Sequence, residues 1–148
     1  MRVDDFEAFA AVTGPRLRRA LVARYGIELG VEATSDAMAY AWEHWSQIAP
    51  MANPTGYLWR VAQSSVRRQH RWSRPLTYPA DSSAVVESGP QLPEKLFELR
   101  PQVRVAVVLV HGYDWSYAEV AELLGVPVST VRNHVHRGLK KLRDGLGD

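Results

Sequence analysis

The chain has 148 residues, with 18 Lys and Arg against 16 Asp and Glu, so its net charge at neutral pH is +2. With 46% hydrophobic and 23% charged residues, it is too apolar for a disordered chain and has the size of one ordinary domain or two small ones. It contains no cysteine, which excludes disulfides, thiolate catalysis and cysteine-ligated metal sites.

Membrane and secretion signals are not evident in the sequence. No apolar run approaches the roughly 20 residues of a membrane-spanning helix. The N-terminus carries Asp4, Asp5 and Glu7 where a secretory signal has a basic start followed by an apolar stretch. We therefore expect a soluble, cytoplasmic protein with no membrane partner.

The first elements predicted are two short helices, over residues 4–13 and 15–25. Apolar residues recur there at helical intervals. The two helices are expected to meet at Gly14 and Pro15, because proline suits the first turn of a helix, where its missing N–H costs nothing.

Gly26 and Gly30 then predict a break, followed by a third helix over 33–49. Thr34, Ser35 and Asp36 offer caps near its N-terminal end. Its predicted apolar stripe consists of Met38, Ala41, Trp42, Trp45, Ile48 and Ala49.

The fourth helix is predicted over 54–72, with Asn53 as its N-cap and Pro54 at its first position. Trp59 falls off the apolar stripe and is expected on the outer face, whereas the other four tryptophans are expected in the core. The predicted inner residues are Leu58, Val61, Ala62, Ser65 and Val66. The predicted outer residues are Trp59, Arg60, Gln63, Ser64, Arg67, Arg68 and Arg71.

Periodicity stops after the fourth helix. Residues 73–92 are rich in proline and serine, which is typical of a linker. The predicted fold is therefore all-α, with a helical domain over 1–72, the linker over 73–92 and a second helical domain over 93–148.

The second domain is predicted to hold three or four helices. A short helix over 93–98 precedes one over 101–112. Ser116 and Glu119 form a Ser-x-x-Glu capping box that opens the next helix, and Gly125 ends it. A last helix is predicted over about 128–143, with Val128, Val131, Val135, Leu139 and Leu142 facing inward.

Positive charge is concentrated in two segments. Residues 60–74 and residues 132–143 each contain five Lys or Arg and no acid. Two basic patches on a nearly neutral chain indicate a polyanion contacted at two places, although solvated helix faces are the simpler alternative.

Segment 116–137 meets the physical requirements of a helix-turn-helix. Ala121 is small where the helices cross, Gly125 allows the turn, and Val131 and Val135 anchor the second helix. The outward residues suit base edges and phosphates in a major groove. They are Ser129, Thr130, Arg132, Asn133, His134, His136 and Arg137.

The run from Tyr117 to Leu142 resembles the C-terminal promoter-reading domain of bacterial RNA polymerase sigma factors. More narrowly, the chain is similar to the extracytoplasmic-function (ECF) group of the sigma-70 family, which has two helical domains and a linker. The first half agrees with this resemblance. Its matching segments are Phe6–Phe9, Pro15–Leu21, Ala41–Trp42 and Gly56–Ala62.

This resemblance implies a transcription initiation factor that binds core RNA polymerase and promoter DNA and is regulated by an anti-sigma protein. The implied contacts with the minus-thirty-five element are Ser129, Thr130, Arg132, Asn133, His134, His136, Arg137 and Lys140. The implied contacts with the minus-ten element are Asn53, Thr55, Trp59, Arg60, Gln63, Ser64, Arg67 and Arg68. The implied contacts with core polymerase are Asp36, Ala39, Tyr40 and Glu43, expected to be exposed.

Two alternatives stay open at this point. The pair Asn133-His134 also resembles the recognition helix of quorum-sensing and response-regulator factors, which do not act as sigma subunits. An enzyme is disfavoured because His134 and His136 point about 200° apart on a helix and because no glycine-rich phosphate loop is present. We expect no catalytic residue, no metal and no cofactor.

Overall fold

The computed structural model describes residues 3–72 and 92–146. Every regular element in these ranges is helical, which confirms the all-α prediction. The chain divides into two compact units, Met1–Thr77 and Tyr78–Asp148. The predicted linker lies outside the described residues except for Leu92, where α5 begins. No helix in the described ranges has both the length and the apolar character needed to cross a bilayer.

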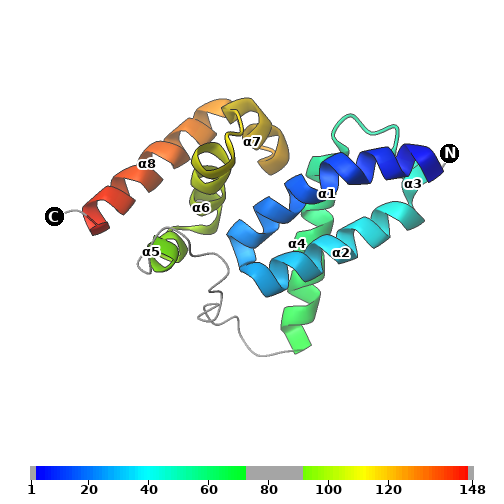
Figure 1. Ribbon diagram of the computed structural model, residues 1–148, viewed down its shortest axis with the longest axis horizontal. Coiled ribbons are helices and arrows are strands. Elements are labelled where there is room, and N and C mark those ends of the chain that lie inside the picture. Colours follow the sequence, from blue (N-terminus) through cyan, green and yellow to red (C-terminus); the bar gives the residue numbers. More distant parts are fainter. Residues whose placement is uncertain (1–2, 73–91, 147–148) are drawn as a thin grey trace. The chain divides into compact units, whose positions relative to one another are not determined.

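The first unit begins with one long helix, α1 (Val3–Tyr25), and the prediction of two helices meeting at Gly14 and Pro15 is wrong. Pro15 lies inside the helix, although an interior proline removes a backbone hydrogen bond. Packing outweighs this cost, since α1 packs along α2 and buries Leu17 and Leu21 completely. Figure 1 shows α1 and α2 side by side.

Helix α2 (Ile27–Glu43) begins six residues earlier than predicted. Gly26 precedes it with a φ of 90°, a conformation that favours glycine. Gly30 does not break the chain but lies within α2, where a Cβ would come 2.6 Å from the backbone N and Cα of Val22. Gly30 therefore permits the close approach of α1 and α2.

The predicted helix over 33–49 is divided in the structure. Helix α2 ends at Glu43, and the short helix α3 (Trp45–Ile48) follows after His44. The Nδ1 of His44 lies 3.0 Å from the carbonyl oxygen of Tyr40, which can only accept, so the ring donates to one of the last carbonyls of α2.

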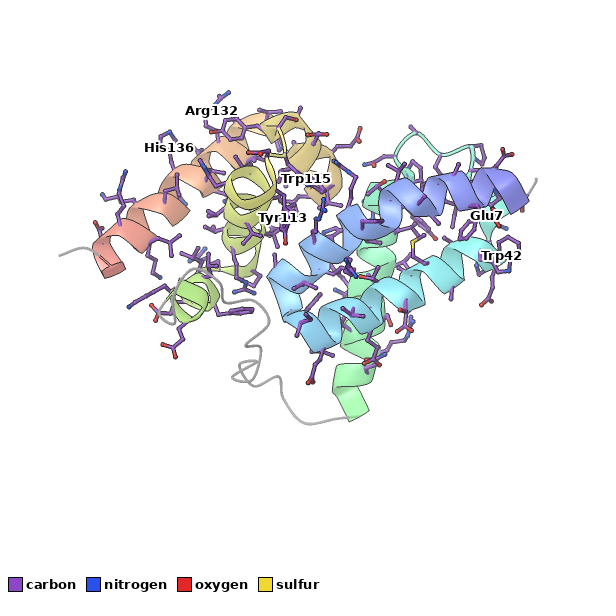
Figure 2. The ribbon with its side chains drawn as sticks, viewed as in Figure 1. Glu7, Trp42, Tyr113, Trp115, Arg132 and His136 are labelled. Atoms are coloured by element: carbon purple, nitrogen blue, oxygen red, sulfur yellow. The ribbon has the colours of Figure 1, made fainter. Side chains whose placement is uncertain are left out.

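Four aromatic residues of this unit, Phe6, Phe9, Trp42 and Trp45, form one cluster. Phe6 packs edge-on against both Trp42 and Trp45, with ring centroids 5.2 and 5.4 Å apart, and Phe9 packs on Trp45. Trp45 is buried, but Trp42 is 50% exposed, so the prediction that Trp42 is a core residue is wrong. Figure 2 shows Trp42 at the same end of the α1–α2 pair as Glu7.

Helix α4 (Pro54–Trp72) has the predicted bounds and contacts both α1 and α2. The Oδ1 of Asn53 accepts a hydrogen bond from the backbone N of Gly56 at 3.0 Å, as expected of an N-cap. Leu58, Ala62 and Val66 are buried, as predicted. The side chain of Trp72, predicted to be a core residue, lies outside what the structure describes.

The second unit begins with α5 (Leu92–Glu98) and α6 (Pro101–Val107), which continues into a π-helical turn, η2 (Val108–Gly112). The helical prediction for 101–112 is confirmed, but its π-helical end was not foreseen. Arg104 is 6% exposed. Its Nη1 donates to the carbonyl oxygen of Leu99 at 3.0 Å, and its guanidinium lies 4.4 Å from the ring centre of Phe97. Arg104 thus ties α5 to α6.

Helices α7 (Tyr117–Leu124) and α8 (Val128–Leu146) complete the unit and pack against each other and against α6 and η2. A Cβ at Gly138 would lie 2.4 Å from Cγ2 of Val107, so α8 crosses α6 closely at this glycine. Val131, Val135 and Leu142 are buried as predicted, whereas Val128 is 38% exposed, contrary to the prediction. Val128 is the first residue of α8, where the helix has just left the turn.

Candidate nucleic-acid and partner interfaces

Helices α7 and α8 form the predicted helix-turn-helix. The Ser116 hydroxyl accepts from the backbone N of Glu119 at 3.0 Å, and a Glu119 carboxylate oxygen accepts from the backbone N of Ser116 at 2.8 Å, which completes the capping box. Gly125 has a φ of 71° and ends α7. Val131 and Val135 anchor α8 through burial. These local signals set which face of α8 is left outward.

The outward face of α8 carries most of the residues predicted to read the duplex. Figure 2 shows Arg132 and His136 projecting from α8 on the side away from α6. Thr130 is partly buried. Residues 123–143 contain no acid, so nothing within this segment offsets the positive charge of the face. The exposed members of the predicted set are Ser129, Arg132, Asn133, His136, Arg137 and Lys140.

Arg132 has an aromatic neighbour across the turn. Its guanidinium carbon lies 5.5 Å from the ring centre of Tyr117, the first residue of α7. This is within the range of a cation–π interaction. Arg132 is itself exposed, so its guanidinium is available to a ligand.

His134 differs from its predicted place on the outer face. Its side chain is partly buried, and neither ring nitrogen is accessible to solvent or has a hydrogen-bond partner among the described residues. Burial lowers the pKa of His134, and the charge of Arg137 lowers it further. The neutral ring faces the body of the unit because residue 134 lies next to the buried stripe of Val131, Val135 and Gly138. The ring nitrogens are therefore not presented to a base edge.

The outer face of α4 carries exposed Arg60, Arg67 and Arg68. The Nη2 of Arg67 donates to the Ser64 hydroxyl at 3.1 Å. Thr55, Gln63 and Ser64 are partly exposed, and Asn53, also partly exposed, serves as the N-cap. This face therefore offers cations and short polar groups, as the sequence indicated.

Trp59 is not on that face. It is 3% exposed, so the prediction that it lies on the outer side of α4 is wrong. Helix α4 packs on both α1 and α2, and the arc that it buries is therefore wider than the single stripe on which the prediction was based. A buried indole cannot stack on an unpaired base, and Trp59 is better described as a core residue.

The four residues predicted to contact core polymerase lie together. Asp36, Ala39, Tyr40 and Glu43 occupy successive turns of α2 and line one side of a groove of about 380 Å³. Helix α4 supplies the other side through Val61, Ser65, Arg68 and Gln69. We call this hollow the α2–α4 groove. Ala39 and Glu43 are exposed as expected, whereas Asp36 and Tyr40 are partly buried.

Hydrogen bonds across the groove fix its acidic side. One carboxylate oxygen of Asp36, Oδ2, accepts from the Ser65 hydroxyl at 2.7 Å and from Nε2 of Gln69 at 3.1 Å. Ser65 is buried, and Asp36 is the acceptor that satisfies its hydroxyl. Asp36 therefore joins α2 to α4 as well as supplying negative charge.

Tyr40 is held in a second connection between the same helices. Its hydroxyl lies 3.0 Å from that of Tyr57, and its ring stacks on His44 with centroids 4.0 Å apart. The hydrogen bond with Tyr57, together with burial, raises the pKa of Tyr40. The phenol stays neutral and is kept in one orientation at the groove.

Several residues of these sites were not foreseen. Tyr57, Ser65 and Gln69 hold the α2–α4 groove, and Tyr117 contacts Arg132 across a turn. Asp36 and Ser65 are 29 positions apart in the chain, so no periodic signal could have joined them. Within the ranges that the structure describes, no group of three His, Asp or Glu residues could hold a metal ion.

A scan against protein families matches residues 91–142 to the model described as Sigma-70, region 4. This segment contains α5 to α7 and most of α8, which includes the helix-turn-helix and its basic face.

Curated proteins with similar sequences include three sigma factors. The ECF RNA polymerase sigma factor SigW of Bacillus subtilis is 33% identical over 70 residues, covering 47% of this chain and 37% of that protein. The ECF RNA polymerase sigma factor SigE of Mycolicibacterium smegmatis is 45% identical over 58 residues, covering 39% and 23%. The RNA polymerase sigma factor CarQ of Myxococcus xanthus is 38% identical over 80 residues, covering 51% and 46%. The chain thus matches less than half the length of each.

A solved structure has the same fold across nearly the whole chain. It is the sigma factor RpoE from Bartonella quintana in complex with the anti-sigma factor NepR, with a TM-score of 0.66 and 19% identity over 97% of this chain and 98% of that one. The region 4 match and the similarity to the three sigma factors bear out the resemblance to ECF-type sigma factors of the sigma-70 family that was seen in the sequence.

Proposed function

We propose that this protein is a transcription initiation factor that binds core RNA polymerase and directs it to specific promoters. The observation that carries the proposal is the region 4 match, because it coincides with a helix-turn-helix whose second helix, α8, has a basic outer face, with no acid over residues 123–143. The protein acts by binding, with no catalytic residue of its own, and works in the cytoplasm, where its template lies.

In this proposal, α8 reads the minus-thirty-five element as duplex DNA. Arg132 and Asn133 are exposed. The guanidinium of arginine pairs with the edge of guanine, and the amide of asparagine pairs with the edge of adenine. Arg137 and Lys140 are exposed cations suited to the flanking phosphates. Ser129, Thr130 and His136 complete the face. His134 is left out because its nitrogens are enclosed.

The outer face of α4 holds the single strand of the minus-ten element. Arg60, Arg67 and Arg68 supply charge for a phosphate backbone, and Gln63 and Ser64 supply polar groups for an exposed base. Asn53 and Thr55 lie at the start of the same helix. Trp59 has no role in this contact because it is buried.

The α2–α4 groove is the proposed contact with core polymerase. Asp36 and Glu43 give it an acidic side, and Ala39 and Val61 give it apolar surface. This mixture of apolar and charged lining is common at specific protein interfaces. We also propose an anti-sigma protein as a regulatory partner, supported by the complex in which the structural neighbour was solved.

The alternative, a helix-turn-helix regulator of the response-regulator or quorum-sensing type, is not favoured. The three curated relatives are sigma factors, and their similarity covers 39–51% of this chain. A plain regulator would also leave the α2–α4 groove without a function.

In vitro transcription distinguishes a transcription initiation factor from a helix-turn-helix regulator. Purified core enzyme, the purified chain and a pool of genomic fragments should yield transcripts whose start sites share two upstream sequence elements. The control omits the chain and should yield none. Transcription that appears only after a separate sigma subunit is added would overturn the proposal and favour the plain regulator.

A further inference from the structure

We propose that Tyr117 is a positioning residue for Arg132, and that Arg132, held by this contact, reads one G·C base pair in the duplex. This inference rests on the proposed function, because it assumes that α8 enters the major groove. Tyr117 does not touch the base in this proposal. It acts by holding the guanidinium of Arg132 in the orientation that guanine requires.

The contact crosses the turn of the helix-turn-helix. Tyr117 is the first residue of α7 and Arg132 is the fifth residue of α8. The guanidinium carbon lies 5.5 Å from the centre of the tyrosine ring, and Tyr117 is partly buried while Arg132 is exposed. The ring therefore supports the arginine from the protein side and leaves its other side open.

A ring is a different kind of support from a carboxylate. An ion pair would occupy the N–H groups of the guanidinium, which lie in its plane. An aromatic face attracts the cation through the π system and leaves these donors free. No carboxylate among the described residues forms an ion pair with Arg132, so its donors stay available for the O6 and N7 of guanine.

The backbone that carries the tyrosine is itself held in place. The capping box joins Ser116 to Glu119 through two hydrogen bonds of 2.8 and 3.0 Å, which close the turn that contains Tyr117, and the tyrosine side chain is partly buried. A long arginine side chain normally loses rotamer freedom when it binds. Support from a fixed ring reduces that loss, because the side chain is already oriented before DNA arrives.

The experiment is a selection from a random-sequence DNA duplex library with the full-length chain, followed by binding measurements on the best duplex. Each G·C pair in that duplex is replaced by A·T in turn. We expect wild type to prefer G·C at one position by roughly 5- to 150-fold, the range of a bidentate arginine contact. Arg132→Ala removes the guanidinium donors and should abolish this preference.

Two substitutions at Tyr117 then separate the ring from the hydroxyl. Tyr117→Leu removes the ring and should reduce the preference by about 2- to 5-fold. Tyr117→Phe keeps the ring and should retain the wild-type preference. Circular dichroism and thermal unfolding check that each variant is folded, and Tyr117→Met serves as a second ring-free variant if Tyr117→Leu is not.

The outcomes distinguish two failures. If wild type enriches no duplex, the proposed reading of DNA by α8 fails, and the inference is overturned with it. If Arg132→Ala abolishes the preference but the folded ring-free variant retains it in full, only the inference is overturned. If Tyr117→Phe behaves like the ring-free variant, the hydroxyl is responsible and the stacking argument is wrong.

Discussion

The two basic faces of this chain, on α4 and on α8, are built differently. The α4 face borders a groove whose other wall belongs to α2, and Asp36 and Tyr40 on α2 are hydrogen-bonded to Ser65, Gln69 and Tyr57 on or near that face. The α8 face belongs to a single helix, and its one contact described across the turn is that of Arg132 with Tyr117.

Because of this difference, substitutions at the two faces should affect folding stability and binding to different extents. Residues of the α2–α4 groove hold two helices together and also line a proposed binding surface, so their substitution should affect both properties. Residues of the α8 face project from a helix that is anchored by other side chains, and their substitution should affect binding while leaving the unfolding free energy almost unchanged.

Gly30→Ala should be the most damaging change. Its Cβ would lie 2.6 Å from backbone atoms of Val22, and backbone cannot move aside without separating α1 from α2. We expect a loss of about 3 kcal/mol in the free energy of unfolding, measured in urea. Gly138→Ala should cost somewhat less, about 2 kcal/mol, because its Cβ would meet the buried side chain of Val107 at 2.4 Å and not backbone atoms.

Gly14→Ala is the matched control for these glycines. Gly14 lies inside α1 with no atom within 4 Å of the added Cβ. This change should stabilise the chain by about 0.5–1 kcal/mol, because glycine is a poor residue in a helix interior. Equal losses from all three substitutions would contradict the close approach inferred at Gly30.

Asp36→Ala should destabilise the protein by about 1–3 kcal/mol, because the buried Ser65 hydroxyl and the Gln69 amide lose their acceptor. It should also weaken binding to core polymerase in a pull-down. Glu43→Ala, on the same side of the groove but exposed, should stay within about 0.5 kcal/mol of wild type. A fully stable Asp36→Ala variant would show that the groove does not depend on this carboxylate.

Arg132→Ala and Arg67→Ala should have separate effects on DNA. Arg132→Ala should change which duplex sequence is preferred, by about 1–3 kcal/mol at one base pair, in a fluorescence anisotropy titration. Arg67→Ala should leave duplex preference unchanged and reduce promoter opening, measured by permanganate reactivity. Sequence-blind losses of equal size from both would remove the distinction between the two faces.

His134 predicts a small dependence of stability on pH. Its pKa is lowered in the folded state by burial and by Arg137, so the unfolded chain binds more protons between the folded value and the ordinary value of about 6.5. The free energy of unfolding should therefore have its full value above about pH 6.5 and decrease as the pH falls below that value.

The measurement is thermal unfolding between pH 5.5 and pH 7.5. His134→Gln should reduce the loss of stability at low pH. His136→Gln, on the exposed face of the same helix, should leave this loss as in wild type. The same slope in His134→Gln as in wild type would assign the dependence to another group.

Features set by short-range patterns were predictable from the sequence. The capping box at Ser116, the turn at Gly125 and the outward placement of Arg132 each follow from residues within one or two helical turns. The cap at Asn53 and the bounds of α4 follow in the same way.

Features set by tertiary packing were not predictable. Pro15 would end an isolated helix, but α1 continues because both of its halves pack on other elements. Trp59 is buried because α4 contacts two helices, whereas Trp42 is half exposed near the end of α2. The ring nitrogens of His134 are enclosed because the residue lies beside the buried stripe of α8, which packs on α6. Each of these depends on a partner that is distant in the sequence.

In the proposed function, α8 recognises duplex DNA and α4 holds the opened strand. This division is tested most directly by transcription with core enzyme from one promoter supplied in two forms, as duplex and with the minus-ten region already unpaired. We predict that the unpaired template restores transcription by Arg67→Ala but not by Arg132→Ala. Restoration of both variants, or of neither, would contradict the division of function between the two helices.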